Sequence, residues 1–515
     1  MKPYPCRACP VRNGVYEKYE KYEGGKGGRV PSMTTQIGRT ASWRTDRAAT
    51  RLQRRVVGVG GLAAAALLVG VTLAPAANIG PVNTGPIAHA VSLRIAPASL
   101  YTPAVALDTV HGYTYVASGN GRHVAVLDTR TGAALRTLTV GVPVPAVPNA
   151  PTLLGPWLVV DPTTGHLFVL AGSLGIRSQI LRLAVLDATT GHTLRVLTLA
   201  GPPGGWGVGA PPLVVDARDG RVFVSRFDLD GLDVLDARTG RVVRSVVIGL
   251  ATRRPKQGVI VAAAAVDEQS RRVFVSDDAN GTVTTLAATS GRVLRVVTVG
   301  PHPAMPLVDT RSGRVTVPTP DWVSVLDATT GRVLRGRVHG GEPSVGYGRA
   351  VDEPTARIVT VGVGGLPLHL RDSTTGRLLR GVPVPGDHMD VAVDGRSGNI
   401  FVLNLGPSSQ RTTAADTSTL FTGYGSVAVL DGRTGIVSHT FPVGLGYGRI
   451  SIDTRLRRAV VVTSGGQLPA GSDPWGWVPS GIRRALPFVS RPSASPHSPA
   501  MATATTVTFI DTSHL

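Results

Sequence analysis

The sequence predicts an all-β fold made of repeated four-stranded units. The first reason is composition: 63 glycines and 39 prolines make up about a fifth of the 515 residues, and such residues break helices. The rest of the chain is rich in Val, Thr and Leu. At 42% hydrophobic and 17% charged, it buries enough apolar surface to fold. The second reason is internal repetition, which also explains a length well beyond one compact core of roughly 150 residues.

Two kinds of hairpin alternate along the chain. One reads VVDPTTGHLFVL from Val159 and VVDARDGRVFVS from Val214, and the other reads AVLDATTGHTLRVL from Ala184 and SVLDATTGRVLRGR from Ser324. Each has two runs of alternating β-branched residues joined by an Asp-x-x-x-Gly-like turn. The Asp side chain accepts hydrogen bonds from turn amides while Gly adopts a positive φ. We therefore interpret these recurring aspartates as structural residues of turns and not as catalytic carboxylates.

Eight copies of each hairpin predict a β-propeller of eight four-stranded blades, with seven blades as the alternative. The first-hairpin turns begin at Asp108, Asp161, Asp216, Asp267, Asp309, Asp352, Asp394 and Asp453. The second-hairpin positions are Asp128, Asp187, Asp236, Ala287, Asp327, Asp372, Asp431 and Asp511.

The last copy, TVTFIDTSHL, ends before a fourth strand, and an open blade would leave a bare sheet edge. We expect the segment AVSLRI, from Ala90, to supply that strand and close the ring. One propeller over 88–515, with a long insertion at 464–505, then accounts for the whole body of the chain.

The N-terminal region has the charge order of an export signal. Residues 56–74 are uncharged and apolar, they follow a basic stretch, and Ala74-Pro75-Ala76 forms a small-residue cleavage site. We predict a disordered basic extension over 1–55 and a signal segment with its cleavage site over 56–76. An uncleaved membrane anchor is the alternative, because the run is just long enough to span a bilayer. Met33 is an alternative start.

The net charge of +20 does not predict nucleic-acid binding. Before residue 77 the chain holds about 13 Lys and Arg against 4 Asp and Glu, and the remaining excess consists almost wholly of arginines that recur once per repeat. A solvated outer strand explains such spacing better than a phosphate-binding patch. Cys6 and Cys9 form a CxxC with no second pair, and the body has no cysteine, so disulfides and thiol chemistry are excluded there.

The unit resembles the YVTN-type β-propeller repeat, in which a strand ending in Val-Gly precedes a Pro-containing loop, as at Val140-Gly141 and Val299-Gly300. It is also similar to quinoprotein-like propeller repeats, which share the Asp-x-x-Thr-Gly turn and usually carry a Trp eight positions after the Asp. In six repeats of this chain that position holds an arginine, namely Arg136, Arg195, Arg244, Arg295, Arg335 and Arg380. The resemblance implies the fold and a surface or exported location, but propellers support many activities.

Candidate binding residues lie in the long loops, which the topology gathers on one face of the ring. Gly-Tyr-Gly-Arg occurs twice, with Tyr347 and Arg349 and with Tyr447 and Arg449, each just before an innermost strand. Such residues at a channel mouth suit an anionic or sugar ligand. The structural alternative is that the glycines allow a tight loop and the tyrosines pack between blades.

Other candidates are weaker. His302 and His388 lie in loops between blades without metal-ligand spacing. Asp228, Asp230 and Asp233 resemble a fragment of a calcium loop that lacks enough oxygen ligands. Trp475 and Trp477, in the last insertion, suit a partner, a membrane surface or a lid over the channel. Trp206, in another long loop, is a further ligand-binding candidate.

The sequence favours a secreted, periplasmic or cell-surface binding module that is noncatalytic and monomeric and has no cofactor or metal. Its expected partner is a protein, a small molecule or a glycan on the loop-rich face, with membrane contact only through an uncleaved anchor. The alternative is a lyase or lactonase-like hydrolase at the channel mouth, which requires a His and two carboxylates within hydrogen-bond reach.

Overall fold

The chain divides into two units, Met1–Val82 and Asn83–Leu515. A computed structural model describes residues of the second unit only: 88–93, 104–118, 121–141, 152–174, 179–201, 212–226, 231–248, 263–278, 280–339, 348–362, 366–384, 386–405, 408–412, 417–421, 425–444, 446–464 and 505–515. The predicted extension and signal segment therefore lie outside the described residues. Within the described ranges no helix is long and apolar enough to cross a membrane.

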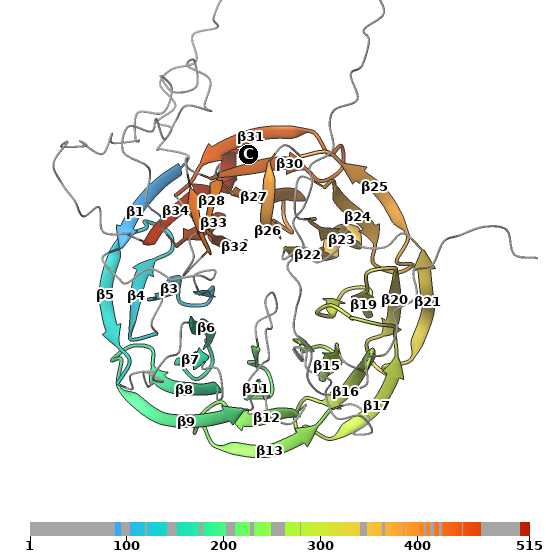
Figure 1. The fold of residues 1–515 in the computed structure, drawn as a ribbon, viewed down its shortest axis with the longest axis horizontal. Coiled ribbons are helices and arrows are strands. Elements are labelled where there is room, and N and C mark those ends of the chain that lie inside the picture. Colours follow the sequence, from blue (N-terminus) through green and yellow to red (C-terminus); the bar gives the residue numbers. More distant parts are fainter. Residues whose placement is uncertain are drawn as a thin grey trace, which may run out of the picture. The chain divides into compact units, whose positions relative to one another are not determined.

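The second unit is a ring of eight four-stranded antiparallel blades (Figure 1). Each innermost strand contacts the innermost strand of the next blade, and those of the first and last blades also touch, so the ring is closed. The prediction of an all-β propeller with eight blades is confirmed, and the seven-bladed alternative is wrong. The described residues add only two short 3-10 helices, η1 (Glu353–Thr355) and η2 (Thr512–His514).

The first four blades each use four consecutive strands, ordered from the channel to the rim. Blade 1 contains β2 (Val105–Asp108), β3 (Tyr113–Ala117), β4 (His123–Asp128) and β5 (Ala134–Thr139). Blade 2 contains β6 (Thr152–Asp161), β7 (His166–Leu174), β8 (Gln179–Asp187) and β9 (Thr193–Gly201). Blade 3 contains β10 (Leu213–Asp216), β11 (Arg221–Arg226), β12 (Gly231–Asp236) and β13 (Val242–Val247). Blade 4 contains β14 (Ala263–Asp267), β15 (Arg272–Asp277), β16 (Thr282–Ala287) and β17 (Val293–Thr298).

The remaining blades include one insertion. Blade 5 contains β18 (Leu307–Asp309), β19 (Arg314–Pro318), β20 (Trp322–Asp327) and β21 (Val333–His339). Blade 6 contains β22 (Arg349–Asp352), β23 (Arg357–Thr360), β24 (Leu368–Asp372) and β25 (Leu378–Val382). Blade 7 contains β26 (Asp387–Val393), β27 (Asn399–Leu405), β30 (Ser426–Asp431) and β31 (Val437–Pro442), and a separate hairpin of β28 (Ser408–Thr412) and β29 (Thr417–Phe421) stands between β27 and β30.

Blade 8 is completed by the N-terminal strand. Its order is β1 (Ala88–Leu93), β34 (Thr505–Asp511), β33 (Arg458–Thr463) and β32 (Gly448–Asp453). Strand β1 pairs antiparallel with β34, from Ala88 opposite Ile510 to Leu93 opposite Thr505. The predicted closure is confirmed, and the strand begins two residues earlier than its sequence pattern indicates.

The recurring aspartates form the turns that the sequence predicts. Asp108 Oδ1 accepts hydrogen bonds from the amides of Val110 at 3.0 Å and His111 at 2.9 Å. The amide of Gly112 donates to the Asp108 carbonyl at 2.8 Å, and Gly112 has a φ of 77°. All eight first-hairpin aspartates are buried. Their role is therefore structural, since seven of them accept from amides inside their own turns and Asp352 accepts from the Thr355 hydroxyl.

Three turns lack the expected glycine. Arg271, Ala356 and Arg457 stand at the glycine position with φ of 56°, 52° and 54°. A side chain in this left-handed region costs free energy that glycine avoids. At Gly398, which has a φ of 74°, an added Cβ would meet no atom within 4 Å. Backbone conformation alone therefore decides the effect of a substitution there.

We expect Ala356→Gly to raise the free energy of unfolding by about 0.5–1 kcal/mol, because relief of the left-handed strain exceeds the added freedom of the unfolded chain. Gly398→Ala in the next blade is the matched reverse change and should lower it by a similar amount. Chemical denaturation of both variants beside the parent protein measures the two effects. Equal stability of all three proteins would contradict the assignment of strain to these turns.

The second-hairpin aspartates make stability sensitive to acid. Hydrogen bonds from turn amides, led by that of Thr190, lower the pKa of Asp187, and the Thr434 amide does the same for Asp431. In five further aspartates the turn's hydrogen bonds outweigh burial, which raises the pKa, so that the net shift is downward. These five are Asp128, Asp236, Asp327, Asp372 and Asp511.

Because these seven carboxyl groups have a lower pKa in the folded than in the unfolded chain, they stabilise the fold fully above the unfolded value of 3.8 and lose this effect as pH falls below it. Burial raises the pKa of Asp216 and Asp390, which opposes the trend at two positions. We expect the melting temperature to fall steeply below about pH 4. Asp187→Asn should flatten that dependence, whereas a melting temperature that stays constant from pH 6 to pH 3 would contradict it.

Arginines of the outer strands connect neighbouring blades. In blades 1 to 4 and in blade 6, the arginine eight positions after the second-hairpin aspartate (Ala287 in blade 4) donates to a turn carbonyl of the next blade. Such pairs are Arg136 with Ala188 at 3.1 Å, Arg195 with Thr239 at 3.0 Å, Arg244 with Ser290 at 3.3 Å, Arg295 with Thr330 at 2.9 Å, and Arg380 with Thr434. The expectation of merely solvated arginines is therefore incomplete, because they also hold successive blades together.

A second series of such bonds starts from the first residue of the second strand. Its pairs are His166 with Ala237, Arg221 with Thr289, Arg272 with Thr329, Arg357 with Gly432, and Arg458 with Arg130. The last pair joins blade 8 to blade 1. We call both series the interblade clasps.

Hydrophobic clusters fill the interfaces between blades, with one exception. Among the described residues, seven clusters each join two successive blades, and none joins blades 5 and 6. There Arg371, fully buried, takes the place before the second-hairpin aspartate that holds Leu or Ile in the other blades. Thr316, also buried, stands where four blades have Phe, and its hydroxyl donates to the Ser373 carbonyl at 3.3 Å. This interface is therefore polar where the others are apolar.

Candidate binding site

The strand ends to which the long loops attach lie on one face of the ring, and the innermost strands start there. Each innermost strand begins after a connection between blades and ends at a first-hairpin turn. First- and second-hairpin turns lie together at the opposite face, as the bond from the Thr129 amide to the Gly112 carbonyl shows at 2.9 Å. The beginnings of the innermost strands therefore surround the loop-rich mouth of the channel.

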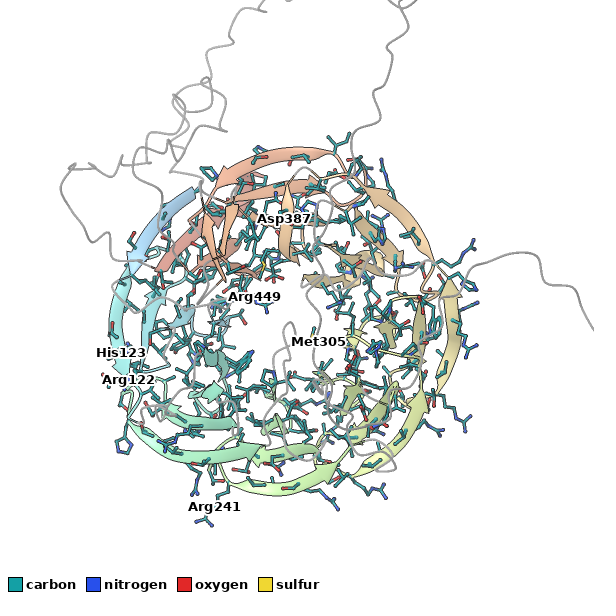
Figure 2. All side chains as sticks on the ribbon, viewed as in Figure 1. Arg122, His123, Arg241, Met305, Asp387 and Arg449 are labelled. Atoms are coloured by element: carbon teal, nitrogen blue, oxygen red, sulfur yellow. The ribbon has the colours of Figure 1, made fainter. Side chains whose placement is uncertain are left out.

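A pocket of about 550 Å³ lies at this mouth. Every blade contributes to it, and the described lining residues are Ala104, Val105, Pro156, Trp157, Leu158, Val159, Leu213, Val214, Val215, Val266, Met305, Arg349, Asp390, Arg449, Ile450 and Ser451. Figure 2 shows Arg449 and Met305 at the centre of the ring. The volume lies within the range that small-molecule sites occupy.

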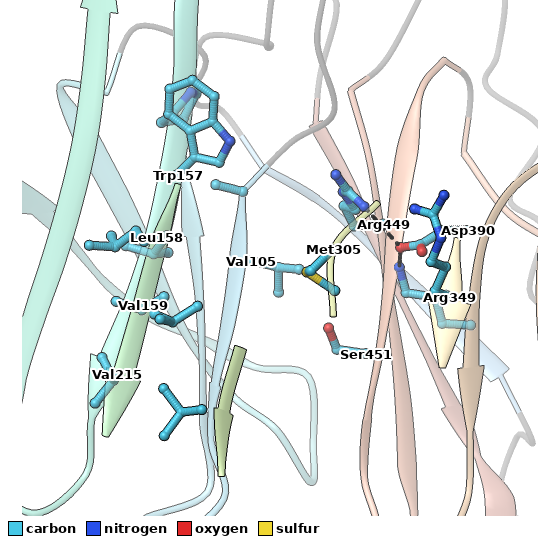
Figure 3. Close-up of a pocket in the computed structure, with 16 residues that line it drawn as sticks. Val105, Trp157, Leu158, Val159, Val215, Met305, Arg349, Asp390, Arg449 and Ser451 are labelled. Atoms are coloured by element: carbon cyan, nitrogen blue, oxygen red, sulfur yellow. Dashed lines mark hydrogen bonds and ion pairs between the residues drawn. The ribbon is translucent and has the colours of Figure 1, made fainter. Parts of the chain in front are cut away.

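Charge and apolar surface are segregated in the pocket. Arg349, Asp390 and Arg449 come from blades 6, 7 and 8, whereas the side chains from blades 1 to 5 are apolar. Figure 3 shows the charged group on one side of the cavity and Trp157 and Leu158 on the other. The pocket therefore has one cationic wall and one apolar wall.

Asp390 is the buried centre of the charged wall. Its Oδ1 accepts from the Val391 amide at 3.0 Å, and its Oδ2 accepts from the Ile450 amide at 3.1 Å. Arg449 Nη1 lies 3.8 Å from Oδ2, an ion pair longer than a normal hydrogen bond. Burial raises the pKa of Asp390, while Arg449 and the two amides act in the opposite direction. The carboxyl group thus connects blades 7 and 8 and positions Arg449.

The glycines of the two Gly-Tyr-Gly-Arg motifs allow the strands to approach closely. A Cβ on Gly348 would lie 2.7 Å from the Asp390 Cα, and one on Gly448 would lie 2.8 Å from the Leu403 side chain. Real Cβ atoms do not tolerate backbone this near, so only glycine lets blades 6 and 7 meet here. This approach brings Arg349 beside Asp390, as Figure 3 shows.

The apolar wall depends on β6, the innermost strand of blade 2. An irregularity in its pairing between Leu154 and Trp157 precedes the lining residues. The half-buried Trp157 also packs against the hydrophobic cluster between blades 2 and 3, which fixes one side of its ring. Across the cavity, Met305 lies between Val105 and the arginines in Figure 3.

The structure brings together only two of the residues predicted as ligand contacts, Arg349 and Arg449. Tyr447 packs against the hydrophobic cluster between blades 7 and 8, which agrees with the alternative that the tyrosines pack between blades. Its motif partner Tyr347 lies outside the described residues. So do the tryptophans of the loops, namely Trp206, Trp475 and Trp477.

The histidines and aspartates that the sequence singles out are separate from the pocket lining. His302 is exposed, with Nδ1 3.2 Å from Asp278, and the buried His388 has Nδ1 2.7 Å from Asn404 Oδ1. Asp233 is buried and accepts from Ser245 Oγ at 2.6 Å. The other two residues of the calcium-loop fragment, Asp228 and Asp230, lie outside the described residues. No group of three or more His, Cys, Asp or Glu suited to a metal occurs in the described part of the chain.

Sequence reasoning missed Asp390, Trp157 and Met305. All three stand four residues before a first-hairpin aspartate, at one register position of the innermost strand. In the eight repeats that position holds Ala104, Trp157, Pro212, Ala263, Met305, Gly348, Asp390 and Arg449. When the repeats are aligned at the turn, Asp390 and Arg449 are the charged residues among these eight. The signal was present in the sequence but requires this register to be seen.

Comparison with known proteins adds little beyond the fold. No protein family model matches the chain, and no curated protein matches it. Among solved structures, BamB from Moraxella catarrhalis aligns at 17% identity with a TM-score of 0.40, over 58% of this chain and 81% of that one. Dihydro-heme d1 dehydrogenase NirN in complex with DHE aligns at 13% identity with a TM-score of 0.48, over 73% of each chain. Neither likeness carries an argument about activity.

Proposed function

We propose that this protein is an exported, monomeric binding module whose ligand occupies the channel-mouth pocket on the loop-rich face. The observation that carries the proposal is the pocket itself. All eight blades line it, and it combines a large apolar wall with a few convergent charged groups, as binding sites do. A relation to the YVTN-type repeat family is part of the same proposal.

Export is proposed from the sequence. The basic stretch, the apolar run at 56–74 and the Ala74-Pro75-Ala76 site support a cleaved signal and a secreted, periplasmic or cell-surface location. Expression of the full chain in a bacterial host, followed by fractionation and mass analysis of the N-terminus, tests this part. A product that starts at Ala77 outside the cytoplasm supports it, and an intact cytoplasmic chain overturns it.

The hydrolase alternative gains no support from the pocket. Its mechanism requires a histidine and two carboxylates within reach of one another, whereas the described lining residues supply one carboxylate and no histidine. The lining chemistry is that of a site that holds a ligand by charge and apolar contact. Binding is therefore the function that the geometry supports best.

Native mass spectrometry of the protein recovered from its producing cells tests the binding role. Ser451 lines the pocket, so Ser451→Phe should fill it, while Ser290→Phe places the same side chain on an exposed turn at the opposite face. We expect a bound mass in the parent protein and in Ser290→Phe that is missing from Ser451→Phe. Identical bound masses in all three proteins, or none in any, would overturn the pocket as the binding site.

A further inference from the structure

We propose that the channel-mouth pocket takes a small anionic amphiphile, namely an organic carboxylate whose head group contacts Arg349 and Arg449 and whose apolar part lies against Trp157, Leu158 and Val159. This inference rests on the proposed function and narrows its ligand to one chemical class.

The charged groups of the wall favour an anionic head group. Among the described lining residues, two guanidinium groups accompany one carboxyl group, that of Asp390. The Asp390 oxygens already accept from two backbone amides, and Arg449 Nη1 approaches Oδ2 only at 3.8 Å. The Arg449 guanidinium, which has five N–H donors, can therefore donate to the carboxylate of a ligand.

The geometry of arginine favours a planar head group. A guanidinium presents two parallel N–H groups that match both oxygens of a carboxylate. Arg349 and Arg449 start from the innermost strands of blades 6 and 8, on either side of Asp390 in blade 7. A head group in front of Asp390 therefore meets arginines on both sides, as the arrangement in Figure 3 indicates.

The opposite wall selects an apolar body. The side chains of Val105, Trp157, Leu158, Val159 and Val215 offer no hydrogen-bonding group apart from the indole N–H. A sugar would lose hydrogen bonds to water against such a surface without replacing them, which costs free energy. An alkyl or aromatic group gains from the same burial. The glycan expectation from the sequence is therefore less well matched than an amphiphile.

Met305 suits a ligand of variable shape. Its flexible thioether lies between the apolar wall and the arginines in Figure 3, and methionine adapts to irregular apolar surfaces. The pocket thus selects a ligand by its charge and polarity more strongly than by the shape of its carbon skeleton. Chain length and ring content of the ligand are properties that this surface tolerates.

Isothermal titration calorimetry of the full chain tests the inference with three probes: decanoate, the neutral decanamide and the sugar maltose. We expect decanoate to bind with one site per chain, decanamide to bind more weakly and maltose not to bind. Arg349→Gln and Arg449→Gln should each weaken decanoate binding by about 10- to 100-fold, the usual effect of losing a hydrogen bond to a charged group. Both should leave decanamide binding unchanged, while Trp157→Ala should weaken both amphiphiles.

Arg241→Gln is the matched control, because Arg241 is an exposed arginine at the outside of the ring in Figure 2. It should not change decanoate binding. If decanoate binding survives both pocket substitutions unchanged, the carboxylate assignment is wrong. The binding role still stands in that case if Ser451→Phe removes the bound mass. If decanoate does not bind and Ser451→Phe has no effect on bound mass, both the ligand class and the proposed function fail.

Discussion

A chain that begins at residue 95 is expected to be far less stable than one that begins at residue 83, although both contain every other strand of the ring. The difference is β1, which pairs along its whole length with β34 and buries Leu93 to 5% exposure. Loss of that leucine and of the strand's hydrogen bonds should cost about 5 kcal/mol or more. This approaches the total stability of an ordinary domain.

Chemical denaturation and size-exclusion chromatography compare the two proteins. The shorter chain should also aggregate, because the edge of β34 is then open to pairing with other chains. A peptide of residues 83–94 added to the shorter chain should restore its stability by strand addition, whereas a scrambled peptide should not. Equal denaturation midpoints for the two chains would show that β1 does not close the ring.

Arg371→Leu is expected to lower the free energy of unfolding, by about 1–3 kcal/mol. Arg371 is fully buried at the blade 5–blade 6 interface, where its Nη1 donates to the Gly376 carbonyl at 3.2 Å. Leucine cannot donate a hydrogen bond, so the groups that Arg371 contacts would be left buried and unsatisfied, which is destabilising. Leucine is the residue that blades 1 to 5 and blade 7 carry at this position.

The reverse substitution at the neighbouring interface is the matched control. Leu326→Arg places a guanidinium in the apolar cluster between blades 4 and 5, and it should lower stability by several kcal/mol or prevent folding. Thermal and chemical denaturation of both variants give the comparison. An Arg371→Leu protein that is as stable as the parent would mean that this interface does not depend on the arginine.

The fold was largely predictable because it depends on local chemistry that repeats. Each Asp-x-x-x-Gly turn fixes a hairpin by its own hydrogen bonds, so its presence is readable wherever it occurs. Closure was predictable for the same reason, since a last blade that lacks one strand must find it elsewhere. The turns at Ala356 and Arg457 were still recognisable without glycine, because the aspartate and the flanking strands remained.

The site was predictable only in part. Arg349 and Arg449 stood out because a short motif repeats around them. Asp390 has no such motif, and its meeting with both arginines depends on the closure of the ring and on the close approach at Gly348. The apolar wall could not be separated by sequence from ordinary core, because Trp157 and its neighbours serve both the core and the cavity. The interblade clasps were not predicted because their acceptors are backbone carbonyls, which every residue has, so the sequence does not show which residue accepts.

The interblade clasps named above all run in one direction around the ring, from a blade to the one that follows it, and the clasp of blade 8 donates to blade 1. Each clasp has the same form, a side-chain donor bonded to a backbone carbonyl of the next blade, so the clasps do not determine the number of blades. The number of blades must therefore depend on the angle between successive blades, which the side chains packed between them determine. If one whole repeat of the gene were duplicated, the added blade could form the same hydrogen bonds to its neighbours. The stability of the longer chain would then depend on whether a ring with one more blade can close.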